Sequence, residues 1–125
     1  MIDWVLDASA ILALIRAEPG ADRVLAALPN AVWSSVNAAE VVTKLIRSGT
    51  GADDARKAVQ LAGCPIVPVD EALALRAGTL AASSKGLSLG DRICLALAER
   101  EKATALTSDR AWASLGLSMK VSLIR

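Results

Sequence analysis

The feature that most constrains the fold is the alternation of short β-like runs with longer segments of helical periodicity along all 125 residues. An order of this kind is typical of a parallel sheet with helices on both faces. No linker, internal repeat or low-complexity segment divides the chain, so we expect one α/β domain over residues 1–125. The expected strands are 2–6, 31–34, 66–69, 103–107 and 119–123, and the expected helices are 8–16, 24–28, 38–46, 52–62, 71–82, 89–100 and 110–115.

Two details of this pattern predict how the sheet is arranged. Pro68 lacks the backbone N–H that a central strand donates, so we expect the strand at 66–69 to lie at an edge. In open parallel sheets, ligands bind outside the carboxyl ends of the strands, near the point where the strand order reverses. Functional residues are therefore expected just after strands, and residues that follow the first and fourth strands would meet if those two strands are neighbours across the reversal.

Histidine is absent from the chain, and this absence excludes several classes of enzyme. Paired-histidine ribonucleases, Ser-His-Asp hydrolases and the usual zinc enzymes all require an imidazole. Hydrolysis near neutral pH would then rely on carboxylates, lysine or a metal ion held by oxygen ligands. The net charge of +1 provides no global attraction to nucleic acid, so any RNA contact must come from a local basic patch.

The cysteines and the apolar segments indicate a cytoplasmic protein. Cys64 and Cys94 form no Cys-x-x-Cys pair and suit reduced, buried thiols. No stretch of 18 apolar residues occurs, so we expect no membrane span. Asp3 and Asp7 interrupt the apolar N-terminal region and no basic segment precedes it, so we do not expect a signal peptide.

The segment GLSLG at 86–90 matches the G-x-S-x-G nucleophile elbow letter for letter. That elbow requires a strand before the serine and a histidine partner, and this chain has neither at this point. We interpret Ser88 instead as the N-cap of a helix, with Asp91 three residues later as its capping-box partner.

Four carboxylates stand out by their positions relative to the expected elements. Asp7 ends the first strand and Asp109 follows the fourth, whereas Glu40 and Asp91 are placed in the first turns of their helices. Because helix starts and strand ends face the same edge of such a sheet, these side chains are expected to meet there. Carboxylates that lie close together repel unless a cation neutralises them, and an all-oxygen set of ligands selects a hard ion, Mg²⁺ or Mn²⁺.

Each of these carboxylates also has a purely structural interpretation. Asp7 and Asp109 can N-cap the helices that they precede, and Glu40 and Asp91 can be the acidic partners of capping boxes begun by Asn37 and Ser88. We interpret three other aspartates at helix starts as caps only: Asp53, Asp54 and Asp70.

Four segments of the chain together resemble a known family. They are VLDASA at 5–10, NAAEV at 37–41, GLSLGDR at 86–92 and TSDRAW at 107–112. In this order and over this length they resemble a PIN domain and, more narrowly, the VapC toxins of bacterial toxin–antitoxin pairs. The resemblance implies a doubly wound fold with about five parallel strands flanked by helices.

The resemblance also implies an activity and partners. These are Mg²⁺- or Mn²⁺-dependent endoribonuclease activity, a homodimer, and neutralisation by a small VapB-type antitoxin that alone would connect the protein to DNA. By the same resemblance Asp7 and Asp91 are direct metal ligands, Glu40 and Asp109 complete the acidic pocket directly or through water, and Ser9 supports the metal site. We hypothesise in-line attack on the phosphodiester that leaves a 5′-phosphate and a 3′-hydroxyl.

Several alternatives remain open. Arg92 and Arg110, each beside a site aspartate, either hold flanking RNA phosphates or are solvated surface residues. The abundant apolar residues of helices 38–46 and 52–62 either fill the core or face a second subunit or the antitoxin. The chain as a whole is a toxin ribonuclease, a PIN nuclease of RNA processing, or a non-catalytic binding module whose carboxylates are only helix caps.

Overall fold

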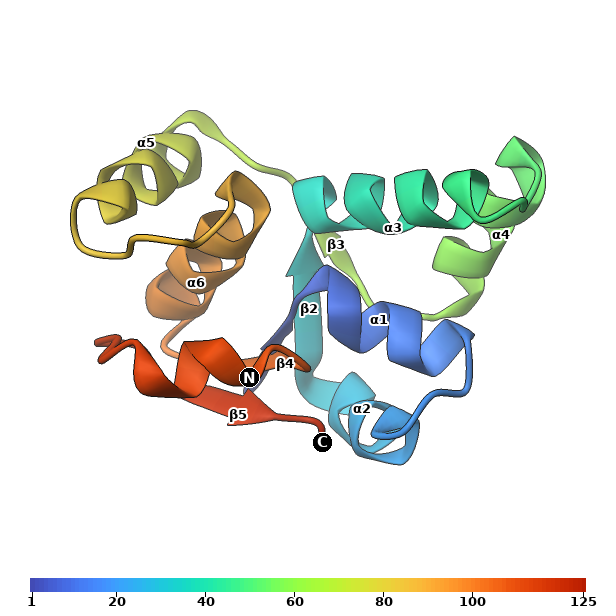
Figure 1. Cartoon of the computed structure of the whole chain (residues 1–125), viewed down its shortest axis with the longest axis horizontal. Coiled ribbons are helices and arrows are strands. Elements are labelled where there is room, and N and C mark those ends of the chain that lie inside the picture. Colours follow the sequence, from blue (N-terminus) through green and yellow to red (C-terminus); the bar gives the residue numbers. More distant parts are fainter.

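The computed structural model describes all residues 1–125 and has a five-stranded sheet at its centre (Figure 1). Every neighbouring pair of strands is parallel, and the spatial order is β3-β2-β1-β4-β5. The predicted α/β fold with about five parallel strands is confirmed. The strands are β1 (Trp4–Leu6), β2 (Ala31–Ser34), β3 (Ile66–Val67), β4 (Thr104–Thr107) and β5 (Val121–Leu123).

Helices cover both faces of the sheet, with α1 to α4 on one side and α5 and α6 on the other (Figure 1). Each expected helix is present, although the expected helix at 110–115 is a 3₁₀ turn and the one at 71–82 ends in another. No helix is both long and apolar enough to cross a membrane. The helices are α1 (Ala8–Ile15), α2 (Ala21–Ala27), α3 (Ser35–Arg47), α4 (Ala52–Leu61), α5 (Glu71–Thr79) and α6 (Leu89–Glu101), and the 3₁₀ turns are η1 (Leu28–Asn30), η2 (Leu80–Ala82) and η3 (Arg110–Ser114).

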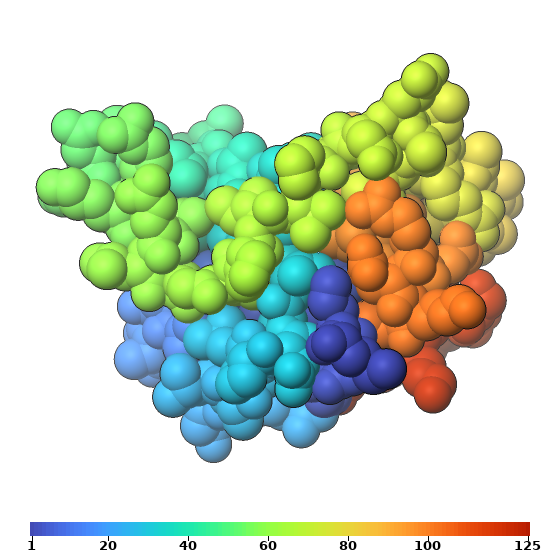
Figure 2. Space-filling view, turned by 180° about the vertical axis from the view of Figure 1, so that it is seen from behind, coloured from blue at the N-terminus to red at the C-terminus, as the bar shows by residue number.

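The central strand β1 is buried from both sides. Val5 packs into the core beneath α5 and α6, whereas Leu6 packs into the core beneath α1 to α4, and neither is exposed. Seen from behind in Figure 2, the dark-blue residues that lead into β1 lie between the cyan residues of β2 and the orange end of α6. Burial on two faces explains why this strand is a continuous apolar run in the sequence.

The order of the strands reverses between β1 and β4. From β1 the chain moves outward through β2 to β3, and it then returns to place β4 on the other side of β1. The two strands pair from Trp4 with Thr104 to Leu6 with Leu106, so they end at the same level. As predicted, the strand that precedes Pro68 lies at the edge of the sheet. The first and fourth strands are neighbours across the reversal, which is the condition under which Asp7 and Asp109 meet.

Side-chain caps begin most of the helices. Asp70 caps α5 by accepting a hydrogen bond from the backbone N–H of Leu73 at 2.8 Å, as predicted. The prediction that Asp53 and Asp54 are caps was wrong: α4 begins after Gly51 without a side-chain cap, and the two aspartates lie in its first turn. There they still interact favourably with the positive end of the helix dipole.

The start of α3 differs from its expected position. Ser34 is the N-cap and accepts a hydrogen bond from the backbone N–H of Asn37 at 3.0 Å. Glu40 therefore lies in the second turn of the helix and is not the acidic partner of a capping box begun by Asn37. The hydrophobic spacing located the helix correctly, but it could not show that β2 passes directly into α3 through a serine cap.

Candidate active site

The four predicted carboxylates line one pocket of about 330 Å³ at the carboxyl end of the sheet. They come from four separate segments: the end of β1, the second turn of α3, the first turn of α6 and the turn after β4. All of the lining residues except Ala8 are polar or charged, and a single basic residue is among them. The pocket is lined by Asp7, Ala8, Ser9, Asn37, Glu40, Lys44, Asp91, Ser108 and Asp109.

Asp7 is the most deeply placed of these carboxylates, with only 5% of its surface exposed. Its Oδ1 accepts hydrogen bonds from the Ser9 hydroxyl at 2.7 Å and from the backbone N–H of Ala10 at 2.9 Å. Its Oδ2 accepts a hydrogen bond from the Thr107 hydroxyl at 2.5 Å. Asp7 is therefore both the N-cap of α1 and a rigidly oriented carboxylate in the pocket.

Burial raises the pKa of Asp7 above its ordinary value of 3.8, because a desolvated carboxylate loses the hydration of its negative charge. The hydrogen bonds from Thr107, Ser9 and Ala10 oppose this effect, and the negative charge of Asp91 adds to it. The pocket thus places a buried carboxylate beside another acid. A cation in the pocket would relieve both sources of the raised pKa.

Two hydroxyls connect the end of β1 to the end of β4. The backbone N–H of Ser108 donates to the Ser9 hydroxyl oxygen at 2.9 Å, and the backbone N–H of Asp109 donates to the Thr107 hydroxyl oxygen at 3.0 Å. Thr107 is completely buried and was not identified from the sequence as a site residue. The only available signal was its position at the last residue of a strand, two residues before Asp109.

Asp109 and Asp91 each cap a helix and also line the pocket. Asp109 is exposed, and its Oδ1 accepts a hydrogen bond from the backbone N–H of Ala111 at 3.0 Å. Asp91 forms the predicted capping box with Ser88, in which each side chain accepts from the other's backbone N–H. Capping and site formation are therefore not alternatives here, because one oxygen of a carboxylate can cap while the group as a whole faces the pocket.

Cys94 lies beneath the acidic pocket on α6 and is fully buried. Burial raises the pKa of its thiol well above the ordinary value, and the charges of Asp7, Asp91 and Glu40 raise it further. The thiol therefore stays neutral and serves as a packing group. Both cysteines are free and buried, as predicted.

The predicted RNA-contacting arginines do not line the pocket. The Arg92 guanidinium turns toward the end of α5, where it donates to the carbonyl oxygens of Ala77 at 3.1 Å and Gly78 at 3.5 Å. Arg110 is exposed on η3, next to Asp109. The basic residue that does line the pocket is Lys44, one helical turn after Glu40 on α3, and sequence reasoning did not identify it.

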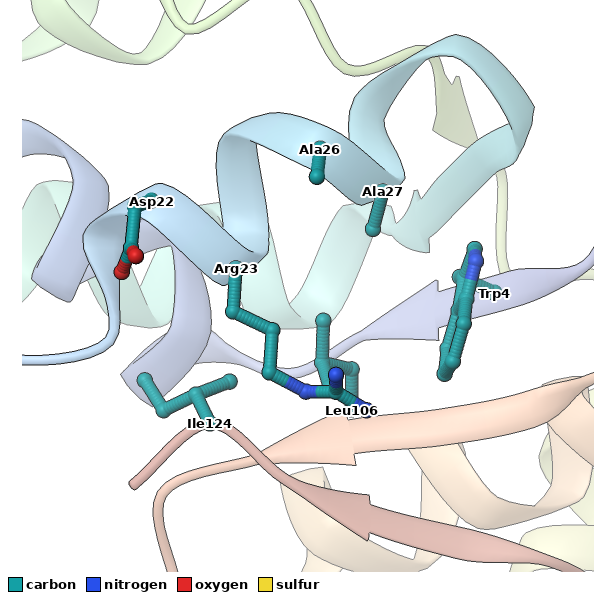
Figure 3. A pocket seen from close by; sticks show the side chains of 7 residues that line it. All are labelled: Trp4, Asp22, Arg23, Ala26, Ala27, Leu106 and Ile124. Atoms are coloured by element: carbon teal, nitrogen blue, oxygen red, sulfur yellow. The ribbon is translucent and has the colours of Figure 1, made fainter.

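Two other cavities lack a cluster of acids. The larger, of about 510 Å³, is lined in part by Trp4, Asp22 and Arg23 and holds one carboxylate (Figure 3). In it the Arg23 guanidinium lies 5.6 Å from the centre of the Trp4 ring. The second, of about 370 Å³, is wholly apolar and is formed by Leu14, Ile15, Leu25, Leu28, Ala58, Leu61 and Ala62.

The acidic pocket offers the oxygen ligands that Mg²⁺ and Mn²⁺ prefer. No three His, Cys, Asp or Glu side chains are placed so that they alone could hold a metal ion. The donor set fits a cation that takes part of its coordination from these carboxylates and the rest from water, which is the usual mode for Mg²⁺.

Solved structures from bacteria have the same fold. The chain is similar to a toxin–antitoxin complex from Klebsiella pneumoniae, with 22% identity, a TM-score of 0.78 and 98% of each chain covered. It is also similar to VapBC2 from Rickettsia felis bound to a promoter DNA fragment, with 16% identity, a TM-score of 0.76 and 98% of each chain covered. VapC20 from Mycobacterium tuberculosis, a sarcin-ricin loop cleaving toxin, has 22% identity and a TM-score of 0.76, with 92% of this chain and 96% of that chain covered.

Among curated proteins, none matches the chain. The sequence profile of the PIN domain matches residues 4–116, which include all four carboxylates of the pocket. On the strength of that match and of the shared fold, the chain belongs to the PIN-domain family.

Proposed function

We propose that this protein is a metal-dependent endoribonuclease that hydrolyses RNA phosphodiester bonds. The observation that carries the proposal is the meeting of Asp7, Glu40, Asp91 and Asp109 in one pocket, although they are spread over more than a hundred positions of the chain. A protein without histidine needs another way to activate water, and a divalent cation held by carboxylates provides one.

In the proposed site Asp7 and Asp91 bind Mg²⁺ or Mn²⁺ directly, and Glu40 and Asp109 complete the shell directly or through water. Ser9 and Thr107 support this role of Asp7, because their hydroxyls donate to its two different oxygens and orient the carboxylate. A bound cation would lower the pKa of a water molecule and stabilise the charge that develops on the phosphate.

The chain's own residues would then bind and orient the RNA. Lys44 is the one basic side chain that lines the pocket, so we assign it the contact with a phosphate oxygen near the scissile bond. Arg110 is exposed beside the pocket and can reach a flanking phosphate. The Arg92 guanidinium donates a hydrogen bond to a carbonyl oxygen at the end of α5, so its contact with RNA has less support. In-line attack would leave a 5′-phosphate and a 3′-hydroxyl.

We further propose that the protein acts in the cytoplasm as the toxin of a toxin–antitoxin pair, as a single PIN domain that forms a homodimer. Two of the similar structures are complexes of a toxin with its antitoxin. The apolar groove between α1, α2 and α4 supports a protein partner, because its Leu61 is 85% exposed and Leu25 60% exposed. We assign this groove to the antitoxin.

The activity is tested by incubating the purified protein with structured and unstructured RNAs in Mn²⁺, in Mg²⁺ and in EDTA. We expect cleavage with either ion, none with EDTA, and recovery when Mn²⁺ is added back. Cleavage that survives chelation would contradict the metal mechanism. Sequencing of the products checks the predicted 5′-phosphate ends.

A binding module remains the second candidate, because Asp7, Asp91 and Asp109 all cap helices. If the protein is a binding module, diverse RNAs should stay intact with both ions. This should hold even after any copurified inhibitor has been removed under denaturing conditions and the protein has been refolded. A short reading frame for a DNA-binding protein just upstream of this one would favour the toxin over a nuclease of RNA processing.

A further inference from the structure

The Glu40 carboxylate occupies space that a side chain at residue 90 would otherwise fill. A Cβ atom added to Gly90 would lie 2.7 Å from both Cδ and Oε2 of Glu40, and closer still to its Oε1. Cβ atoms in proteins essentially never approach a heavy atom of a non-neighbouring residue within 3.0 Å, so one of the two groups must move. The carboxylate of α3 therefore rests directly on the backbone of α6, one residue before Asp91.

Asn37 holds the Glu40 carboxylate in this place. Its Nδ2 donates to Oε1 of Glu40 at 2.6 Å and to the carbonyl oxygen of Gly90 at 3.2 Å. Its Oδ1 accepts a hydrogen bond from the Ser34 hydroxyl at 2.9 Å, and only 1% of the residue is exposed. These three partners determine which way the amide faces, and they require a side chain with two N–H donors at this position.

From these contacts we propose that Asn37 and Gly90 are positioning residues for Glu40, which together set how far its carboxylate stands from Asp91. Asn37 supplies the attraction, because its amide bonds both the carboxylate and the α6 backbone. Gly90 supplies the space. The inference rests on the proposed metal-dependent function, because it gives the contact between α3 and α6 a role in placing the carboxylates that bind the metal ion.

Gly90→Ala tests the proposal most directly. Alanine is the better helix former, so a position with open space would become more stable. At residue 90 the new methyl group must push the carboxylate away. We expect Mn²⁺ binding, measured by calorimetry, to weaken about 10- to 100-fold, as is usual when a group that supports a metal ligand is changed. RNA cleavage should fall by a similar factor. Gly78→Ala on α5 is the matched control, because nothing lies within 4 Å of its added Cβ.

A double-mutant cycle with Glu40→Ala shows whether Gly90 acts through Glu40. In the Glu40→Ala background, Gly90→Ala should weaken Mn²⁺ binding no further. It should also raise the unfolding temperature by roughly 3 °C, the gain expected of alanine in an unobstructed helix. In the wild-type background that thermal gain should be absent. An equal loss of Mn²⁺ affinity in both backgrounds, or wild-type affinity in the single variant, would overturn the proposal.

The unfolding temperatures of the four proteins in the cycle distinguish a failure of this proposal from a failure of the proposed function. If the wild-type protein cleaves no RNA but the cycle still shows that Gly90→Ala is tolerated only without Glu40, the contact stands and the nuclease assignment falls. If Gly90→Ala prevents folding, adding Glu40→Ala to the same chain should restore folding. A double variant that still fails to fold would contradict the proposal. Asn37→Leu is the second variant: its side chain is of similar size but has no N–H donors and no charge, and it should release Glu40 and weaken Mn²⁺ binding in the same range.

Discussion

Asp7 caps α1 and lines the acidic pocket, and these two roles need different properties of one side chain. The cap needs an oxygen that accepts from the backbone N–H of Ala10. The pocket needs a negative charge that can bind a cation. Asparagine keeps the first property and removes the second, so one substitution separates the roles.

We expect Asp7→Asn to lower RNA cleavage at least about 100-fold, because a neutral amide is a much weaker metal ligand than a carboxylate. Since Asn caps helices as well as Asp does, the free energy of unfolding should stay within about 1 kcal/mol of the wild-type value or rise. Initial rates and thermal unfolding measure the two effects. Wild-type activity in this variant would show that the carboxylate is only a cap.

Thr107 offers a matched pair of substitutions at a completely buried position. Thr107→Val keeps the shape but removes the hydroxyl that donates to Asp7 and accepts from Asp109, so we expect cleavage to fall about 10- to 100-fold. Thr107→Ser keeps the hydroxyl and removes a methyl group, which should cost about 1 kcal/mol of stability and leave most of the activity. Equal activities of the two variants would mean that the hydroxyl has no role in orienting Asp7.

Among the helices, α5 and α6 are joined by a side-chain contact that the sequence did not predict. Arg92 follows Asp91 in the chain, so contact with RNA was one of its two interpretations from the sequence. Its side chain leaves α6 in a different direction and donates to the last carbonyl groups of α5. Those carbonyls lie in the last turn of α5, where a cation also interacts favourably with the negative end of the helix dipole.

Arg92→Ala should therefore lower the stability of the protein more than it weakens substrate binding. We expect the free energy of unfolding to fall by about 1 kcal/mol, the usual effect of losing such a cap, while KM for RNA changes less than about twofold. Chemical denaturation and initial rates provide the two numbers. A large rise in KM with unchanged stability would favour the other interpretation, that Arg92 holds an RNA phosphate.

Across the whole molecule, the acidic pocket exists only when the chain is folded, because its carboxylates come from four segments. The folded state raises the pKa of Asp7 above 3.8. A group of this kind contributes its stability below its unfolded pKa and loses it as pH rises through the folded pKa. In the absence of metal, the ionised pocket thus opposes folding at neutral pH.

We expect the wild-type protein in EDTA to lose stability relative to Asp7→Asn as pH rises from about 4 upward. Mn²⁺ should reverse this loss at pH 7, because an ion that binds only the folded protein adds about 2.7 kcal/mol at one hundred times its dissociation constant. Thermal unfolding of both variants across pH, with and without Mn²⁺, tests the linkage. A difference between the variants that does not vary with pH would contradict it.

Local chemistry along the chain was enough to predict the elements of the fold. The apolar runs, the serine and aspartate caps, and Pro68 each act over a few residues, so the strands, most helix starts and the edge position of β3 could be predicted without coordinates. The exceptions have local causes too. Glu40 was placed one turn too early because Ser34, the last residue of β2, is also the cap of α3.

No local sequence pattern shows in which direction a side chain leaves its helix or strand, or which residues it contacts there. Several contacts join residues far apart in the chain: the carboxylate of Glu40 against Gly90, the hydrogen bond from Thr107 to Asp7, the position of Lys44 in the pocket and the turn of Arg92 toward α5. Such contacts depend on how β1, β4, α3 and α6 pack around the point where the sheet reverses. They were decided by that packing, because only the packed chain brings those surfaces within the few ångströms over which hydrogen bonds and charges act.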